Sequence, residues 1–146
     1  MNFLPNKAHL GINAALFVAY HASKDNPISG AAIARHYNLG SRSLEPVLQT
    51  LGNAGLLQSV RGQAGGYYID SPDKISVRDI ITCFISRLLP ECSAFSEFSP
   101  VLTKFTEKNY ELFLNNMSEV TIKDLCDDST ENKLPKLQKD ILLFEI

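Results

Sequence analysis

The residues best suited to chemistry form a polar segment in the first half of the chain. This segment contains Ser41, Arg42, Ser43, Glu45 and Gln49. Arginine can hold guanine through two hydrogen bonds, glutamate can accept one from cytosine, and serine or glutamine can contact several bases. We therefore regard these side chains as candidates for reading the edges of DNA bases. A solvated helix face, which most helices have, is the alternative interpretation.

A second candidate is the glycine-containing loop from Arg61 to Gly66, which also carries Gln63. An arginine in such a loop could enter the minor groove of DNA, whose negative potential attracts cations. A nucleotide-binding loop would instead require a Gly-Lys-Ser or Gly-Lys-Thr sequence before a helix, and here Tyr67 follows. Lys7, near the start of the chain, could contact a phosphate group or only solvent.

The chain has three cysteines, Cys83, Cys92 and Cys126, and their spacing matches no zinc or iron–sulfur ligand pattern. Their odd number argues against a disulfide framework and indicates a reduced protein. Cys83 lies among apolar residues, which favours a packing role. Cys92 follows a proline in a predicted loop and could be reactive. Both remain possible redox-sensing residues.

Several function classes are disfavoured by the sequence. The three histidines have no partner at metal-ligand spacing, and no side chain has the context of a nucleophile with its base, so we expect neither a metal site nor an enzyme. No stretch approaches the roughly 20 apolar residues of a membrane span, and the first residues do not resemble a secretion signal. We expect a cytoplasmic protein.

The charges are divided unevenly along a chain whose composition is typical of a globular protein. Residues 1–78 carry seven Lys or Arg against four Asp or Glu, a balance of +3. Residues 79–146 carry seven against twelve, a balance of −5. A basic front half is expected where only that part meets a polyanion, although chance could also divide so few charges in this way.

The elements that must position these residues follow from apolar periodicity and capping signals. Helices are predicted over about Lys7–Ser23 and over Gly30–Tyr37, the second with Ser29 as its N-cap. A compact turn over 38–40 follows, in which Gly40 supplies the backbone freedom. These two helices and the turn are typical of the first half of a helix-turn-helix.

The third predicted helix carries the polar segment. Because proline fits only in the first turn of a helix, Pro46 places the N-cap at Ser43, and Gly55 should end the helix. Two strands, over 56–60 and 67–69, enclose the glycine-containing loop and form a hairpin. The expected fold is mainly α with a small β-hairpin, a winged helix-turn-helix from Ser29 to Ile69.

Three further helices are predicted in the second half. They run over Val77–Leu88 with Ser76 as N-cap, over about Pro100–Met117 behind Ser99, and over Ile122–Cys126 with Thr121 as N-cap. Residues 127–133 are polar and expected to be loose. We therefore divide the chain into a DNA-binding domain (1–78), a helical dimerisation and possible sensing region (79–127), and a C-terminal tail (128–146).

Several segments together resemble the Rrf-two family of bacterial winged-helix transcription regulators, the family of IscR, NsrR and CymR. They are Leu44-Glu45-Pro46-Val47-Leu48, Gly55-Leu56-Leu57, Ser59-Val60-Arg61-Gly62 and Gly65-Gly66-Tyr67. The likeness covers about residues 7–127. It implies a homodimer that binds a palindromic operator in double-stranded DNA and usually represses, with Glu45 discriminating bases and Arg61 in the minor groove.

The resemblance also implies that the long helix joins the two subunits. Its apolar stripe consists of Val101, Leu102, Phe105, Leu112, Phe113 and Met117. Some family members hold a [2Fe–2S] cluster through three closely spaced cysteines before this helix, but here only Cys92 lies in that region, so we expect a cluster-free member without cofactor. The tyrosine often found before Leu-Glu is Ser43, which leaves the operator sequence open.

Two alternatives to a DNA-binding repressor remain at this stage. One is a regulator that responds to redox state or to an iron–sulfur cluster. The other is a protein-interaction module that kept the fold without the DNA contacts, and its surface around Arg42 and Arg61 would be neutral or acidic. The sequence leaves the regulated genes, the signal and its direction open.

Overall fold

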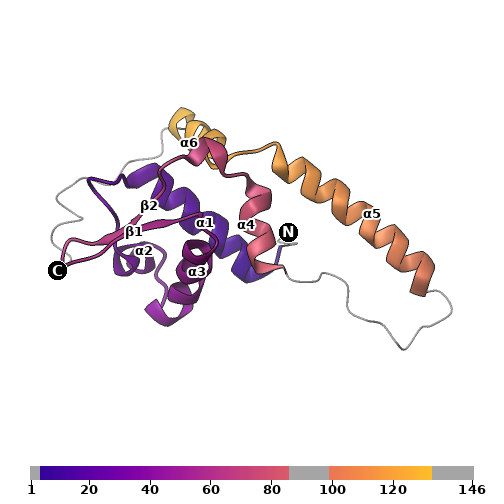
Figure 1. Cartoon of the computed structure of the whole chain (residues 1–146), viewed down its shortest axis with the longest axis horizontal. Helices are drawn as coiled ribbons and strands as arrows, with labels where there is room; N and C mark the ends of the chain where they lie inside the picture. Colours follow the sequence, from indigo (N-terminus) through magenta and orange to yellow (C-terminus); the bar gives the residue numbers. More distant parts are fainter. Residues whose placement is uncertain (1–3, 86–98, 133–146) are drawn as a thin grey trace.

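The computed structural model describes residues 4–85 and 99–132, which form helices and one antiparallel hairpin (Figure 1). The elements are, in chain order, α1 (Asn6–His21), α2 (Gly30–His36), α3 (Ser41–Asn53), β1 (Gln58–Val60), β2 (Gly66–Tyr68), the short 3-10 helix η1 (Pro72–Lys74), α4 (Val77–Phe84), α5 (Ser99–Ser118) and α6 (Ile122–Glu131). The predicted fold, mainly α with a small hairpin, is confirmed.

One apolar core joins the first helices to α4 and α6. Helix α1 packs against α3, α4 and α6, and its Ala14 and Val18 are fully buried. Ile80 of α4 and Ile122 of α6 are also fully buried in this core. The core therefore includes residues on both sides of the predicted domain boundary at residue 78.

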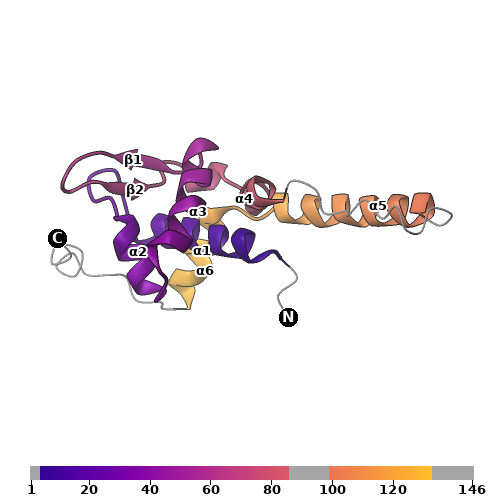
Figure 2. The ribbon, with the colours of Figure 1, turned by 90° about the horizontal axis from the view of Figure 1, so that it is seen from below.

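Helix α5 extends away from this body (Figures 1 and 2). Only its C-terminal part packs, in a second apolar cluster formed by Val77, Ile81 and Leu114. Phe113 and Met117 pack against that cluster and are half-buried. The rest of α5 is left without a partner among the described residues.

Helix α3 begins three residues earlier than predicted. Ser41 is its first residue, Gly40 is an N-cap without a side-chain hydrogen bond, and Pro46 lies inside the helix, so Ser43 as N-cap is wrong. A proline inside a helix costs about 3 kcal/mol. Burial of each large apolar side chain returns about 1.5–3 kcal/mol, and four are buried on this helix: Leu44, Val47, Leu48 and Leu51. Burial therefore outweighs the local preference.

The turn before α3 also differs from the prediction. Asn38, with φ 52°, takes the left-handed conformation, whereas Gly40 has an ordinary φ of −67°. Asparagine tolerates this conformation better than most residues, because its short polar side chain bonds locally. The sequence favours Gly40 for the left-handed position of this turn, but Asn38 occupies it.

Three helix ends differ by two residues or more. Helix α1 ends at His21 because Ser23 pairs with Asn26 in a small bridge. Helix α4 ends at Phe84, since Ile85 is extended, and the rest of the predicted 77–88 helix lies outside the described residues. Helix α6 continues to Glu131 rather than ending at Cys126, so the loose segment predicted from residue 127 is wrong as far as 131.

The longer α6 has a local physical cause. Lys123 donates a 2.6 Å hydrogen bond to Asp127, four residues on, which is a stabilising spacing in a helix. The hydroxyls of Ser129 and Thr130 donate to carbonyls one turn back, so both side chains are satisfied within the helix. The predicted caps of α2, α4 and α6 are confirmed: Ser29, Ser76 and Thr121.

Candidate nucleic-acid interface

The position of α3 is fixed at both ends by backbone hydrogen bonds. The N–H of Leu39 donates to the Ala34 carbonyl at 2.8 Å, which closes the turn after α2. At the other end Gly55, with φ 74°, ends α3 as predicted. The N–H groups of Gly55 and Leu56 donate to Gly52 and Leu51, at 3.0 and 2.9 Å, as in a Schellman motif. The chain therefore leaves α3 in a defined direction and begins the hairpin.

The polar residues of α3 line two different hollows. Arg42 and Ser43 line a cleft of about 600 Å³ together with Lys7 of α1. We call it the α1–α3–α4 cleft, and its described lining residues are Asn6, Lys7, Leu10, Arg42, Ser43, Pro46, Val47, Thr50, Cys83 and Phe84. The structure thus brings three predicted DNA-contacting residues together, although Lys7 is far from the other two in sequence.

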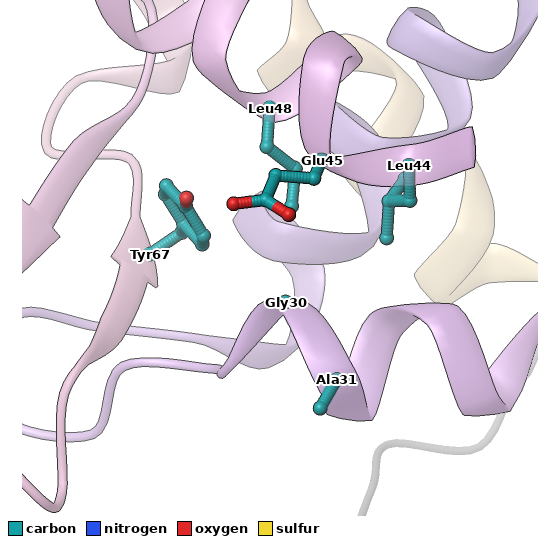
Figure 3. Close-up of a pocket in the computed structure, with 6 residues that line it drawn as sticks. All are labelled: Gly30, Ala31, Leu44, Glu45, Leu48 and Tyr67. Carbon is teal, nitrogen blue, oxygen red and sulfur yellow. The ribbon is translucent and has the colours of Figure 1, made fainter. Parts of the chain in front are cut away.

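Glu45 lies on the opposite side of α3, in a smaller pocket of about 280 Å³. Figure 3 shows its carboxylate directed away from α3, between the ring of Tyr67 and the start of α2 at Gly30. Tyr67 belongs to β2, so this pocket lies where the reading helix meets the hairpin. Tyr67 was not singled out by sequence reasoning, because no spacing rule connects residue 45 with residue 67.

The hairpin is tied to the segment before α2. Tyr67 donates to the Ile28 carbonyl at 2.7 Å, and the Ile28 N–H donates to the Tyr67 carbonyl at 3.0 Å. The two segments approach so closely that a Cβ on Gly66 would lie 2.4 Å from the Ile28 carbonyl group. A glycine is therefore required here for the hairpin to keep its place beside α3.

Arg61 and Gln63 lie in the loop between β1 and β2, and both side chains are exposed. Gly62 has φ 115°, and the Gly65 N–H donates to its carbonyl at 3.0 Å, which makes the loop compact. Within the described parts of the chain no hydrogen bond or ion pair holds the Arg61 guanidinium. Gln49 is exposed on α3 outside both hollows, and for Ser41 only the backbone is described.

Cys83 also lines the α1–α3–α4 cleft and is half-buried. Its thiol donates to the Asp79 carbonyl at 3.2 Å. Burial and, secondly, the nearby Asp79 carboxylate raise the pKa of Cys83 above 9.0. A raised pKa keeps the thiol protonated and disfavours the reactive thiolate. Cys92, the other predicted redox residue, lies outside the described residues.

Two histidines have packing partners. The rings of His21 and His36 both lie 4.5 Å from the ring of Phe17, measured between centroids. Across residues 4–85 and 99–132, no group of three His, Cys, Asp or Glu side chains could hold a metal ion. Each helix within these residues is too short or too polar to span a lipid bilayer.

The predicted dimer stripe of α5 divides into two parts. Val101, Leu102, Phe105 and Leu112 are 72, 59, 64 and 53% exposed. Phe113 and Met117 instead pack within their own chain, together with Leu114, which sequence reasoning missed. The periodicity of the stripe could have indicated Leu114, but not which side chains would remain uncovered.

Comparison with known proteins gives one consistent answer. A family model described as "Rrf2: Iron-dependent Transcriptional regulator" matches residues 4–128. Over 58 residues the chain is 45% identical to the HTH-type transcriptional regulator CymR of Bacillus subtilis, a match that covers 39% of this chain and 42% of that one. Solved structures of similar fold include T. potens IscR, with a TM-score of 0.73, 28% identity and coverage of 93% and 94% of the two chains. Another is B. subtilis CymR, described as the global cysteine regulator, with a TM-score of 0.69, 27% identity and coverage of 87% and 98%.

Proposed function

This chain belongs to the Rrf2 family of transcriptional regulators, and on that premise we propose that it represses transcription as a homodimer on a palindromic operator. It is a DNA-binding regulator of the helix-turn-helix type, as its relatives are. The arrangement of α3 and the hairpin supports the specific contacts proposed below. Such a protein acts where the DNA is, in the bacterial cytoplasm, and performs no catalysis.

The reading contacts are assigned to α3 and the hairpin. The observation that carries this assignment is that Glu45 of α3 and Tyr67 of β2 line one pocket (Figure 3). A helix and a hairpin held side by side can occupy a major groove and the adjoining minor groove. In this proposal Ser41, Arg42, Ser43, Glu45 and Gln49 face base edges or phosphates in the major groove. Arg61 enters the minor groove, with Gln63 beside it.

The charge around these residues favours DNA over a purely protein-binding module. Lys7 and Arg42 line a cleft whose described lining residues include no Asp or Glu. Neither cation forms an ion pair with another described residue. Unpaired cations on the reading side are suited to phosphate groups. A protein-binding module that had lost its DNA contacts would not need unpaired cations on this side.

The dimer is assigned to α5. Large apolar side chains rarely stay exposed in a contiguous group unless another surface covers them. Val101, Leu102, Phe105 and Leu112 form such a group on a helix that extends away from the body. A second copy that offers the same stripe would bury both, as two-fold symmetry requires. We propose that this face joins the two subunits.

We propose that the regulator works without an iron–sulfur cluster. The family model is described as iron-dependent, but the described residues provide no group of three potential ligands. The segment 86–98 contributes Cys92 as its one cysteine. This donor set does not fit a cluster held by several cysteines, so no step of the proposed mechanism passes through one.

Fluorescence anisotropy with labelled DNA from upstream of the gene tests the proposal. Affinity should fall steeply as salt rises, because phosphate contacts release counterions. Unrelated DNA of equal length is the control and should bind about a thousandfold more weakly. Absent binding at low ionic strength, or binding that ignores salt, contradicts the proposed function.

A further inference from the structure

The α1–α3–α4 cleft combines unpaired cations with an apolar wall. Lys7 and Arg42 are exposed and line it from two different helices. Leu10 and Phe84, both half-buried, supply apolar surface from α1 and α4. The described lining residues carry two cationic side chains and no carboxylate, and the nearest carboxylate that acts on the lining is that of Asp79, beside Cys83.

DNA alone does not account for this combination. A phosphate group would pair with Lys7 or Arg42 but would not cover the side of Leu10 and Phe84 that faces the cleft, since both pack against the core only in part. The cleft volume of about 600 Å³ lies in the range of small-molecule sites, which are mostly apolar with a few polar groups that fix orientation. The shape and chemistry therefore suit a compact ligand better than a strand of backbone.

We propose that this cleft binds a small organic anion with an apolar body, such as an aromatic or alkyl carboxylate or sulfonate. Its anionic group would meet Lys7 and Arg42, and its apolar body would contact Leu10 and Phe84. Because Arg42 is also assigned to the reading end of α3, bound ligand and DNA compete. The regulatory part of this inference rests on the proposed function, whereas the binding part does not.

Fluorescence titration of the full chain with anilinonaphthalene sulfonate tests the binding part. The sulfonate should bind saturably and about tenfold more tightly than neutral phenylnaphthylamine, because the two dyes differ in charge. Cys83→Glu places a carboxylate in the cleft and should weaken sulfonate binding about tenfold. Thr82→Glu is the matched control, since Thr82 is exposed on α4 outside the lining residues, and it should bind like the wild type.

A second variant guards against misfolding of the first. Asn6→Asp adds a negative charge at the first residue of α1, where an acidic side chain favours the helix, and it should weaken sulfonate binding about threefold. The exposed stripe of α5 could also bind dye. Only the dye binding that is weakened in Cys83→Glu and Asn6→Asp is therefore assigned to the cleft. Equal binding of both dyes, or wild-type binding by both Cys83→Glu and Asn6→Asp, overturns the inference.

The regulatory part is measured with operator DNA. Saturating sulfonate should lower DNA affinity about tenfold, and saturating DNA should lower sulfonate affinity by the same factor, since coupling between two ligands is reciprocal. Dye binding without any DNA binding would contradict the proposed function but leave the site intact. Normal DNA binding that the dye leaves unchanged would overturn the regulatory part alone.

Discussion

Tyr67 and Ile28 exchange two backbone hydrogen bonds, of 2.7 and 3.0 Å, and so hold the hairpin against the segment that leads into α2. The neighbouring Gly66 makes this pairing possible, because any Cβ there would collide with the Ile28 backbone. The position of the hairpin beside α3 therefore depends on a contact between two segments far apart in sequence.

Replacement of Gly66 by alanine tests that dependence. Gly66→Ala should lower the free energy of unfolding by about 2 kcal/mol, because backbone atoms must shift to admit the new Cβ. Gly52→Ala is a matched control on α3, where an added Cβ meets nothing within 4 Å, and it should raise the free energy by about 0.5–1 kcal/mol. Urea denaturation measures both. A Gly66→Ala protein as stable as the wild type would show that the segments pair loosely.

Glu45 should determine base preference more than affinity. Glu45→Ala should bind the preferred operator nearly as well, but lose about tenfold discrimination against a base change at the position it reads. Titration of the operator and of its single-base variants measures this ratio. Asn53→Ala, exposed at the far end of the same helix, should keep the full discrimination. Unchanged ratios in Glu45→Ala would remove Glu45 from the reading surface.

Arg61 should act mainly through its charge. Arg61→Ala should lower affinity about tenfold for all operator variants alike and reduce the slope of log affinity against log salt by about 1. Arg61→Lys keeps the charge and should keep the slope. Salt titrations of the three proteins test this prediction, which is wrong if the lysine and alanine variants share one slope.

Substitution in the uncovered stripe of α5 should produce monomers. Phe105→Glu should raise the dimer dissociation constant at least about a hundredfold, because two buried phenylalanines are lost per dimer. Lys104→Glu, at an exposed neighbouring position, should leave the dimer intact. Sedimentation equilibrium separates the two outcomes. A Phe105→Glu protein that remains dimeric would place the interface elsewhere.

Acid stability should depend on Asp124. Hydrogen bonds from the Thr121 hydroxyl and, secondly, its backbone N–H hold the pKa of Asp124 below its ordinary 3.8. A carboxyl group whose pKa is lower in the folded state stabilises the fold above its ordinary pKa, and this stabilisation is lost as pH falls through the folded-state pKa. Asp124→Asn should therefore have a lower melting temperature than the wild type at about pH 7. The difference between the two melting temperatures should become smaller below about pH 3. Asp128→Asn, where the backbone carbonyl accepts both hydrogen bonds from Asn132, is the control for removing one negative charge from α6. A melting difference for Asp124→Asn that stays the same at low pH would contradict the prediction.

The elements could be predicted because their signals are local. Ser29, Ser76 and Thr121 each precede a helix with the expected polar side chain, and Gly55 ends α3 as glycine commonly does. The start of α3 was predicted wrongly from Pro46, because burial of apolar side chains on α3 outweighs the cost of a proline inside the helix. Such a balance between local preference and packing is not visible in a short window of sequence.

The hollows beside α3 could not be predicted in the same way. Lys7, Arg42 and Cys83 meet in one cleft only because α1 crosses both α3 and α4 in the core. Likewise, Phe113 and Phe105 look equivalent in the α5 stripe, yet one packs on α4 and the other stays exposed. Both results depend on helix packing between distant segments, which periodicity within one helix does not specify.

The starts of α4 and α6 have a consequence for how this protein could change over evolution. Ser76 and Thr121, the two N-caps, pair with each other in a small antiparallel bridge, flanked by hydrogen bonds of 2.8 and 2.9 Å. The first residues of α4 and α6 thus lie side by side, and α4 packs into the core through Ile80, whereas α5 extends away from it (Figure 1). Because only the part of α5 around Leu114 packs against α4, the exposed part of α5 before it can change in length or sequence at little cost to the core. Relatives could therefore respond to new signals through a changed segment between Ser76 and Thr121, while the helix-turn-helix and the hairpin stay the same.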